Sequence, residues 1–135
     1  MPLSVEDRLE IADLLALHGH LMDAGAFDRL GDMFTEDILY DVSSMRDGVR
    51  LTGIAAVIEA ATALGERNPV AHHTTNIIIL GEAPGGAVRC CSKGIAVFAD
   101  GQTGSVVYED VLERTAQGWR ISIRRVLPRQ RPLER

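Results

Sequence analysis

The sequence predicts an α+β fold: a cone-shaped barrel in which N-terminal helices pack on one face of a curved, mostly antiparallel sheet. Two observations support this prediction. Helical patterns dominate the first 64 residues, whereas four long β-rich segments follow residue 70. Because a sheet bent around a helical layer leaves space between the two layers, the same pattern predicts a pocket there.

The first helix has clear start and stop signals. Ser4 with Asp7 three residues later is typical of a capped helix start. Apolar residues from Leu9 onward recur at near-helical spacing, and Gly25 can take the left-handed conformation that ends a helix. We therefore expect a helix that ends at about Met22 or Asp23.

Three shorter elements precede the long strands. They are a helix from Phe27 or Asp28 to about Phe34, a strand over 38–42 and an alanine-rich helix over 54–64. Glu36-Asp37 is expected to turn the chain into the strand. The polar stretch 43–52, with its turn signal Asp47-Gly48, is expected to be a loop.

The second half of the chain predicts a meander. The β-rich segments cover about 71–80, 87–98, 105–114 and 119–127, and glycine-containing breaks between them are typical of hairpins. Residues 128–135 are rich in proline and arginine, and we interpret them as a solvated tail or as a segment that packs in an oligomer. The length of 135 residues predicts a single domain over 1–135.

Composition and charge exclude several classes of protein. The chain is 46% hydrophobic, which argues against disorder, and its net charge of -5 argues against nucleic acid or an anionic membrane as the main partner. No apolar run approaches the roughly 18 residues of a membrane-spanning helix, and the N-terminus does not resemble a signal peptide, so we expect a cytoplasmic protein. Scarce aromatic residues and the spacing of the histidines predict neither a cofactor nor a metal.

Three groups of local strings, in their order along the chain, carry a family resemblance. The first comprises Ile11-Ala12-Asp13-Leu14, Asp23, Phe27-Asp28-Arg29-Leu30 and Met33-Phe34; the second is Ala71-His72-His73-Thr74-Thr75-Asn76; the third comprises Glu113-Arg114, Gly118-Trp119-Arg120-Ile121 and Arg124-Arg125. Together they resemble the SnoaL-like branch of the nuclear transport factor 2-like superfamily, from about Val5 to Val126. The resemblance implies the cone fold and a homo-oligomer, a dimer or a trimer.

Within that superfamily, the chain is similar to scytalone dehydratase and hexachlorocyclohexane dehydrochlorinase, which are cofactor-free eliminating enzymes that use a His–Asp pair. The resemblance implies Asp23 and His72 as the matching pair. The chain departs from the dehydratase in two places: residues 93–98 hold no histidine, and Met22 replaces a tyrosine.

A His–Asp pair suits proton abstraction for a physical reason. An aspartate that accepts the imidazole N–H orients the ring and stabilises the imidazolium that forms. Asp23 could instead be an exposed residue at a helix end, although a carboxylate there opposes the helix dipole and needs a partner. Because His72 and His73 alternate along a strand, only one can face the pocket, and a register error of one residue would exchange their roles.

Other polar side chains are candidates for the pocket. His18 and His20 could line its mouth, although solvent-facing helix histidines are commoner. Tyr40 or Tyr108 could donate a hydrogen bond to a substrate oxygen. The residues expected to contact substrate are Tyr40, Tyr108, Met22, Phe34, Val97 and Arg124.

Strand alternation leads to further expectations about faces. Trp119, Ile121 and Ile123 are expected in the core, with Arg124 on the opposite face, where it meets an anionic group at the pocket or an acidic side chain. The outer sheet face is expected to be lined by residues such as Ile77, Ile79 and Val111. Such an apolar surface would be covered by another subunit.

The leading hypothesis is a cofactor-independent lyase or isomerase that acts by His72–Asp23 proton abstraction on a small hydrophobic, cyclic substrate, as in a dehydratase-like elimination. A non-catalytic module that binds a small molecule or assembles with other chains is the alternative, because fold does not settle function. A third hypothesis is a steroid-isomerase-like enzyme, which would need Asp41 as a carboxylate base in the pocket.

Overall fold

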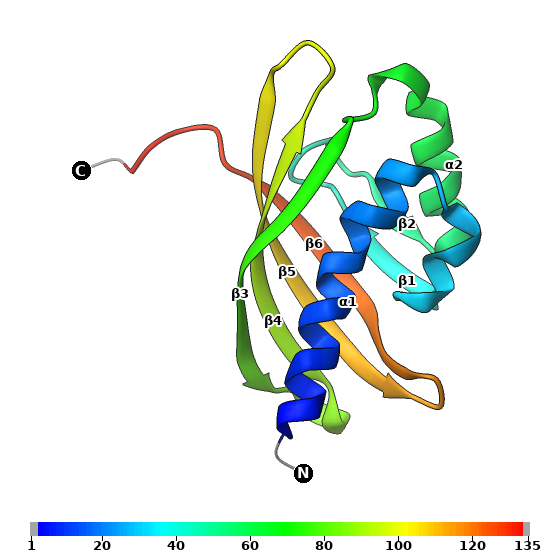
Figure 1. Ribbon diagram of the computed structural model, residues 1–135, viewed down its shortest axis with the longest axis vertical. Coiled ribbons are helices and arrows are strands. Elements are labelled where there is room, and N and C mark those ends of the chain that lie inside the picture. Colours follow the sequence, from blue (N-terminus) through cyan, green and yellow to red (C-terminus); the bar gives the residue numbers. More distant parts are fainter. Residues whose placement is uncertain (1–2, 134–135) are drawn as a thin grey trace.

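The computed structural model describes residues 3–133 and shows helices lying against the concave face of one six-stranded sheet (Figure 1). The strand order is β2-β1-β6-β5-β4-β3. The helical elements are α1 (Val5–Ala24), η1 (Phe27–Asp32), α2 (Ile54–Leu64), η2 (Gly65–Arg67) and η3 (Pro84–Gly86). The strands are β1 (Phe34–Asp41), β2 (Arg50–Thr52), β3 (Ala71–Glu82), β4 (Val88–Val97), β5 (Thr103–Thr115) and β6 (Gly118–Pro128).

Helix α1 begins and ends where the sequence predicts. Ser4 and Asp7 form a reciprocal capping box with both bonds at 3.0 Å, and Gly25 closes the helix with φ of 65°. Asp7 also accepts hydrogen bonds from Arg114 and from the Trp119 indole N–H. Asp7 therefore fixes the start of α1 to strands β5 and β6.

The region between α1 and α2 differs from the prediction. Strand β1 begins at Phe34, which pairs in parallel with Ile121 of β6, and it includes the expected turn at Glu36-Asp37. The pairing with β6 is irregular over that turn and resumes at Leu39↔Ile123. The expected loop over 43–52 ends in the short strand β2, which pairs antiparallel with β1. At β2, long-range strand pairing outweighs local turn propensity.

The predicted meander is confirmed, since β3, β4, β5 and β6 pair antiparallel with their neighbours in chain order. Only β1 runs parallel to its partner β6, so the sheet of the described residues is mixed. In Figure 1, α1 crosses the sheet diagonally and α2 lies beside β1 and β2.

A bulge in β6 overturns the alternation expected there. Ile121 pairs with Leu112 and Ile123 with Val111, so Ser122 is an extra residue. As a result Arg124 is buried on the same face as Trp119 and Ile121 rather than on the opposite face.

A second bulge, in β3, reverses the expected outer face. Thr75 pairs with Lys93 and Ile78 with Cys91, so two residues of β3 oppose one of β4, and Asn76 takes a positive φ of 55°. Ile77 and Ile79 therefore pack toward the core, and Ile78 and Leu80 are exposed instead.

The core lies between α1, the η1 turn and the sheet. Its most deeply buried side chains include Ile11, Leu15, Leu30, Met33, Phe34, Leu112, Trp119 and Ile121. No helix among residues 3–133 is long and apolar enough to cross a membrane.

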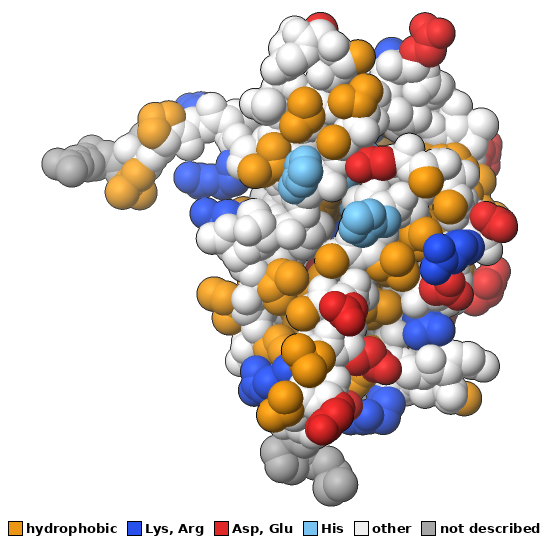
Figure 2. All heavy atoms as spheres, in the orientation of Figure 1, with side chains coloured by type: hydrophobic (Ala, Val, Ile, Leu, Met, Phe, Trp, Pro, Cys, Tyr) orange, Lys and Arg blue, Asp and Glu red, His pale blue; other side chains and the backbone are white. Residues whose placement is uncertain are grey.

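After β6, the Arg129 amide bonds the Ser105 carbonyl at 2.8 Å, and residues up to 133 then extend away from the body (Figures 1 and 2). The last two residues of the predicted tail lie outside the described range.

Candidate active site

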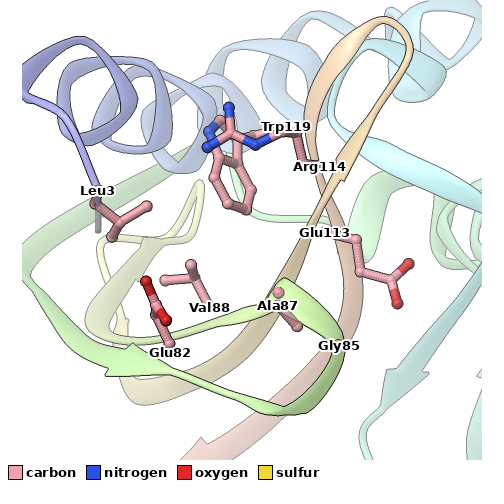
Figure 3. Close-up of a pocket in the computed structure, with 9 residues that line it drawn as sticks. Leu3, Glu82, Gly85, Ala87, Val88, Glu113, Arg114 and Trp119 are labelled. Carbon is pink, nitrogen blue, oxygen red and sulfur yellow. The ribbon is translucent and has the colours of Figure 1, made fainter. Parts of the chain in front are cut away.

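One cavity, of about 410 Å³, lies near the start of α1 (Figure 3). Figure 3 shows Arg114 stacked on Trp119, with the carboxylates of Glu82 and Glu113 apart from each other. Arg114 and the Trp119 indole N–H are both bonded to Asp7. Because Arg114 and Trp119 already stabilise the fold and the two glutamates lie apart, this cavity brings no polar side chains together as a reactive group.

A second cavity, of about 370 Å³, lies between α1, α2, the loop after β1 and the sheet. Its wall is mostly apolar, as ligand pockets usually are. The polar or charged side chains among its lining residues are His18, Tyr40, Arg46, Asn68, His72 and Tyr108. This is the cavity that the sequence places between helices and sheet.

The structure brings Asp23 and His72 together at the wall of this cavity. Asp23 Oδ1 lies 2.7 Å from His72 Nδ1, and Asp23 Oδ2 accepts the His72 backbone N–H at 3.1 Å. Both carboxylate oxygens are therefore satisfied, and His72 is the partner that a carboxylate in the last turn of a helix needs. In the tautomer in which Nδ1–H donates to Asp23, Nε2 is the ring nitrogen that could accept a proton.

A glycine allows α1 to approach β3 closely enough for this pair. A Cβ atom on Gly19 would collide with the carbonyl oxygen of His72. His73, the next residue of β3, is exposed on the opposite face. The structure thus places His72, not His73, toward the cavity.

His18 lies in the site, so of the two positions that the sequence leaves open for it, the cavity and solvent, the structure shows the cavity. Its side chain is 2% exposed, and its ring meets His72 edge-on at 5.4 Å between centroids. Its Nε2 lies 3.4 Å from the Tyr40 hydroxyl. Burial, followed by the charge of Arg124, holds the pKa of His18 well below its ordinary value, so this imidazole is neutral.

The signal that would have found His18 is its place on the apolar stripe of α1. It stands three residues after Leu15 and three before Leu21, both of which are core residues. His20, on the other side of the helix, is exposed.

Both predicted tyrosines line the cavity. Burial raises the pKa of the Tyr40 and Tyr108 hydroxyls, so both remain protonated and able to donate. The Tyr108 ring lies across Gly94, where a Cβ atom would collide with it.

Arg124 does not line the cavity; it lies behind the Tyr108 ring, with its Cζ 4.1 Å from the ring centroid. Its side chain is 0% exposed, and its Nε and Nη2 donate to Asp110 Oδ1 and Oδ2 at 2.8 and 2.9 Å. Burial opposes the charge of Arg124, but the Asp110 carboxylate more than compensates and raises its pKa. The expected pairing with an acidic side chain is present.

Of the three remaining residues that were expected to contact substrate, one lines the cavity and two do not. Met22 lines the cavity, whereas Phe34 lies in the core and contacts Tyr40 edge-on instead. Val97 faces outward, because it alternates with Ala96 and Phe98, which do line the cavity.

Asp41, the carboxylate required by a steroid-isomerase-like site, lies outside the cavity. It accepts the Ser43 N–H at 2.9 Å and pairs with Arg50 at 3.4 Å. The hydrogen bonds from Ser43 lower the pKa of Asp41, and its carboxylate is paired with Arg50 outside the cavity. Within residues 3–133, no group of three or more His, Cys, Asp or Glu side chains is arranged to hold a metal ion.

Helices on the concave face of a curved sheet, with an apolar cavity between the layers, define the class of this protein. The chain has the cystatin-like fold of nuclear transport factor 2-like proteins. Within that class it belongs to the SnoaL-like family, whose domain model matches residues 3–125. The predicted fold and family resemblance are confirmed.

Three solved structures illustrate the likeness. A nuclear transport factor 2-like protein of Novosphingobium aromaticivorans is 28% identical, with 92% of this chain and 82% of that chain covered and a TM-score of 0.69. A protein of unknown function from Mycobacterium tuberculosis, in an Asp-to-Asn variant, is 27% identical, with 90% and 71% covered and a TM-score of 0.74. Another Novosphingobium aromaticivorans protein, provisionally named an aromatic ring hydroxylase, is 26% identical, with 96% and 94% covered and a TM-score of 0.75.

A search of curated proteins gives no match to this sequence. The SnoaL-like family includes enzymes, whereas many of the similar structures are of unknown function. Family membership therefore leaves the reaction to be argued from the site.

Proposed function

We propose that the protein is a cofactor-independent lyase or isomerase in which His72 removes a proton from a small, hydrophobic, cyclic substrate. The observation that carries this proposal is the 2.7 Å contact between His72 Nδ1 and Asp23 Oδ1 at the wall of an apolar cavity. An oriented imidazole with a free nitrogen beside a substrate pocket is the arrangement that general-base catalysis needs.

The proposed reaction begins with proton transfer and continues with movement of an electron pair on the substrate. Nε2 of His72 takes a proton from carbon, and Asp23 stabilises the imidazolium that forms. The electron pair left on the substrate moves toward an oxygen, where Tyr40 or Tyr108 donates a hydrogen bond to the developing charge. In an elimination, the carbonyl re-forms and a leaving group such as hydroxide is expelled, which takes the proton from His72 and departs as water. In an isomerisation, His72 returns its proton to another carbon of the substrate.

The surroundings of the pair support this role. His18 is neutral and lies edge-on to His72, so it places no second positive charge beside the imidazolium. The apolar wall limits water around the developing charge, which strengthens the hydrogen bond of a tyrosine to it.

A deuterium wash-in experiment tests the proposal without knowledge of the leaving group. Cyclic ketones such as β-tetralone are incubated with protein in deuterated water, and incorporation next to the carbonyl is followed by mass spectrometry. The protein is expected to accelerate incorporation, and His72→Gln to reduce the acceleration by about 100-fold or more. Asp23→Asn is expected to reduce it as well.

His73→Gln is the matched control, because it makes the same change one residue away on the exposed face of β3. Its exchange rate is expected to equal that of the unmodified protein. An exchange rate in His72→Gln equal to that of the unmodified protein would rule out the proposed base.

The alternative is a non-catalytic module that holds a small apolar molecule, which the largely apolar wall also favours. Under that function a ketone would bind without any protein-dependent exchange. In either case, we propose that the protein acts in the cytoplasm, as a homo-oligomer that covers the exposed Ile78 and Leu80.

A further inference from the structure

We infer that Arg46 binds an anionic group of the ligand at the mouth of the cavity, so that the substrate is an organic acid with an apolar body. The inference deepens the proposed function and depends on it only in taking the same cavity as the substrate site.

The described part of the cavity wall carries one permanent positive charge and no negative one. Among the described residues that line the cavity, only His18, His72 and Arg46 can carry a positive charge, and none is an aspartate or glutamate. His18 is buried and neutral, and the Asp23 carboxylate balances the charge that His72 takes up. Arg46 is therefore the one permanent charge on this wall, in a chain whose net charge is -5.

The Arg46 guanidinium is unpaired among the described residues. No ion pair or hydrogen bond of this side chain occurs within residues 3–133, whereas Arg50 pairs with Asp41 at 3.4 Å and Arg125 with Glu109 at 2.8 Å. The backbone of Arg46 is nevertheless fixed, because its N–H donates to the Val42 carbonyl at 2.8 Å and its carbonyl accepts from Val49 at 3.1 Å. Because hydrogen bonds fix the backbone of Arg46 and its guanidinium is unpaired, this side chain is suited to bind a carboxylate.

The positive charge of Arg46 lies at the rim of the cavity. The inner end of the cavity is formed by buried residues such as Val57 and Tyr108, and its rim by exposed ones such as Met45 and Arg46. Burial of an anion at the inner end would be costly, whereas at the rim the anion keeps part of its hydration. An apolar body inside and a carboxylate at the rim match this gradient.

A pair of probes with one body tests the inference. β-Naphthoate and β-naphthamide differ in charge and share the same bicyclic ring, and their dissociation constants are measured by calorimetry at low and high salt. The unmodified protein is expected to bind the acid roughly three- to tenfold more tightly than the amide, with a smaller ratio at high salt. Arg46→Met is expected to abolish the preference, and Arg46→Lys to retain part of it.

Arg89→Met is the matched control, because it removes the same charge from an exposed site on β4 that does not line the cavity. It is expected to keep the preference for the acid. Equal affinities of the unmodified protein for the two probes, or a preference that survives in Arg46→Met, would overturn the inference. So would an equal loss in Arg89→Met, which would assign the preference to net charge.

The inference and the proposed function can fail separately. His72→Gln is expected to retain the preference for the acid even though it loses deuterium exchange. A retained preference with no exchange in the unmodified protein contradicts only the proposed reaction. Exchange that depends on His72, together with no preference for the acid, contradicts only the role of Arg46.

Discussion

At the scale of single residues, the site depends on side chains that are absent as well as on those that are present. Gly19 lets α1 approach the backbone of His72, and Gly94 leaves room for the ring of Tyr108. The first approach brings Asp23 within reach of both the backbone and the ring of His72. The histidine and the aspartate are therefore positioned by a glycine that takes no part in the chemistry.

We expect Gly19→Ala to destabilise the protein by about 1–3 kcal/mol, because the new methyl group must push α1 away from β3. The loss is measured by urea denaturation, and deuterium wash-in is expected to fall with it as the Asp23–His72 contact lengthens.

Gly31→Ala is the control, since a Cβ atom there meets nothing within 4 Å. It is expected to change stability by less than about 0.5 kcal/mol. Equal stabilities of the two variants would show that the close approach of α1 and β3 is not needed.

At the scale of elements, the bulges explain what the sequence could and could not predict. The helices and hairpins were predictable because their signals are local: the Ser4–Asp7 cap, Gly25 and the glycine-containing breaks between strands. The facing of Arg124 was not, because strict alternation fails after the extra residue Ser122.

The same limit applies to the candidate site. Asp23 and His72 were found through family resemblance, since residues 49 positions apart share no local pattern. For His18 the sequence leaves both the cavity and solvent open, because a histidine occurs on either side of a surface helix. Its spacing from Leu15 and Leu21 is the signal that favours the buried side. Strand β2 was not predicted, because its three residues carry no strand pattern of their own and become a strand only by pairing with β1.

The bulge also creates a buried ion pair, and its removal has a predictable cost. Arg124→Met is expected to destabilise the protein by about 3–5 kcal/mol, because Asp110 would remain buried without its partner. A double variant, Asp110→Leu with Arg124→Met, is expected to recover most of that loss, as measured by urea denaturation.

The neighbouring Arg125→Met is the comparison for this prediction. Arg125 pairs with Glu109 at 2.8 Å on the exposed face, so its loss is expected to cost less than about 1 kcal/mol. Similar losses in Arg124→Met and Arg125→Met would contradict the importance given to the buried pair.

At the scale of the whole molecule, the sheet has one covered and one open face. Helices cover the concave face, while Ile78 and Leu80 on β3 are 59% and 57% exposed and Ile95 on β4 is also exposed. Figure 2 shows other apolar side chains dispersed among acidic and basic ones over α1 and β3. Ile78 and Leu80 are two residues apart on the same face of β3, and we expect a second subunit to cover this pair.

We expect the protein to sediment as a dimer or trimer of its 14.7 kDa chain. Ile78→Glu combined with Leu80→Glu is expected to reduce the sedimenting mass to that of one chain, because a buried charge would oppose the contact. Leu9→Glu, at another exposed apolar position on α1, is expected to leave the mass unchanged. A monomeric unmodified protein would contradict the expectation.

In the proposed reaction, Asp23 holds the proton of His72 on Nδ1 and leaves Nε2 free as a base. Long-range proton–nitrogen NMR spectra of isotope-labelled protein report the tautomer of each neutral histidine directly. We predict that neutral His72 carries its proton on Nδ1, that Asp23→Asn disturbs this tautomer, and that an added cyclic ketone shifts the Nε2 resonance. A neutral His72 with its proton on Nε2 would contradict the proposed role of His72 as the base, because that ring could not accept a proton from substrate in the cavity.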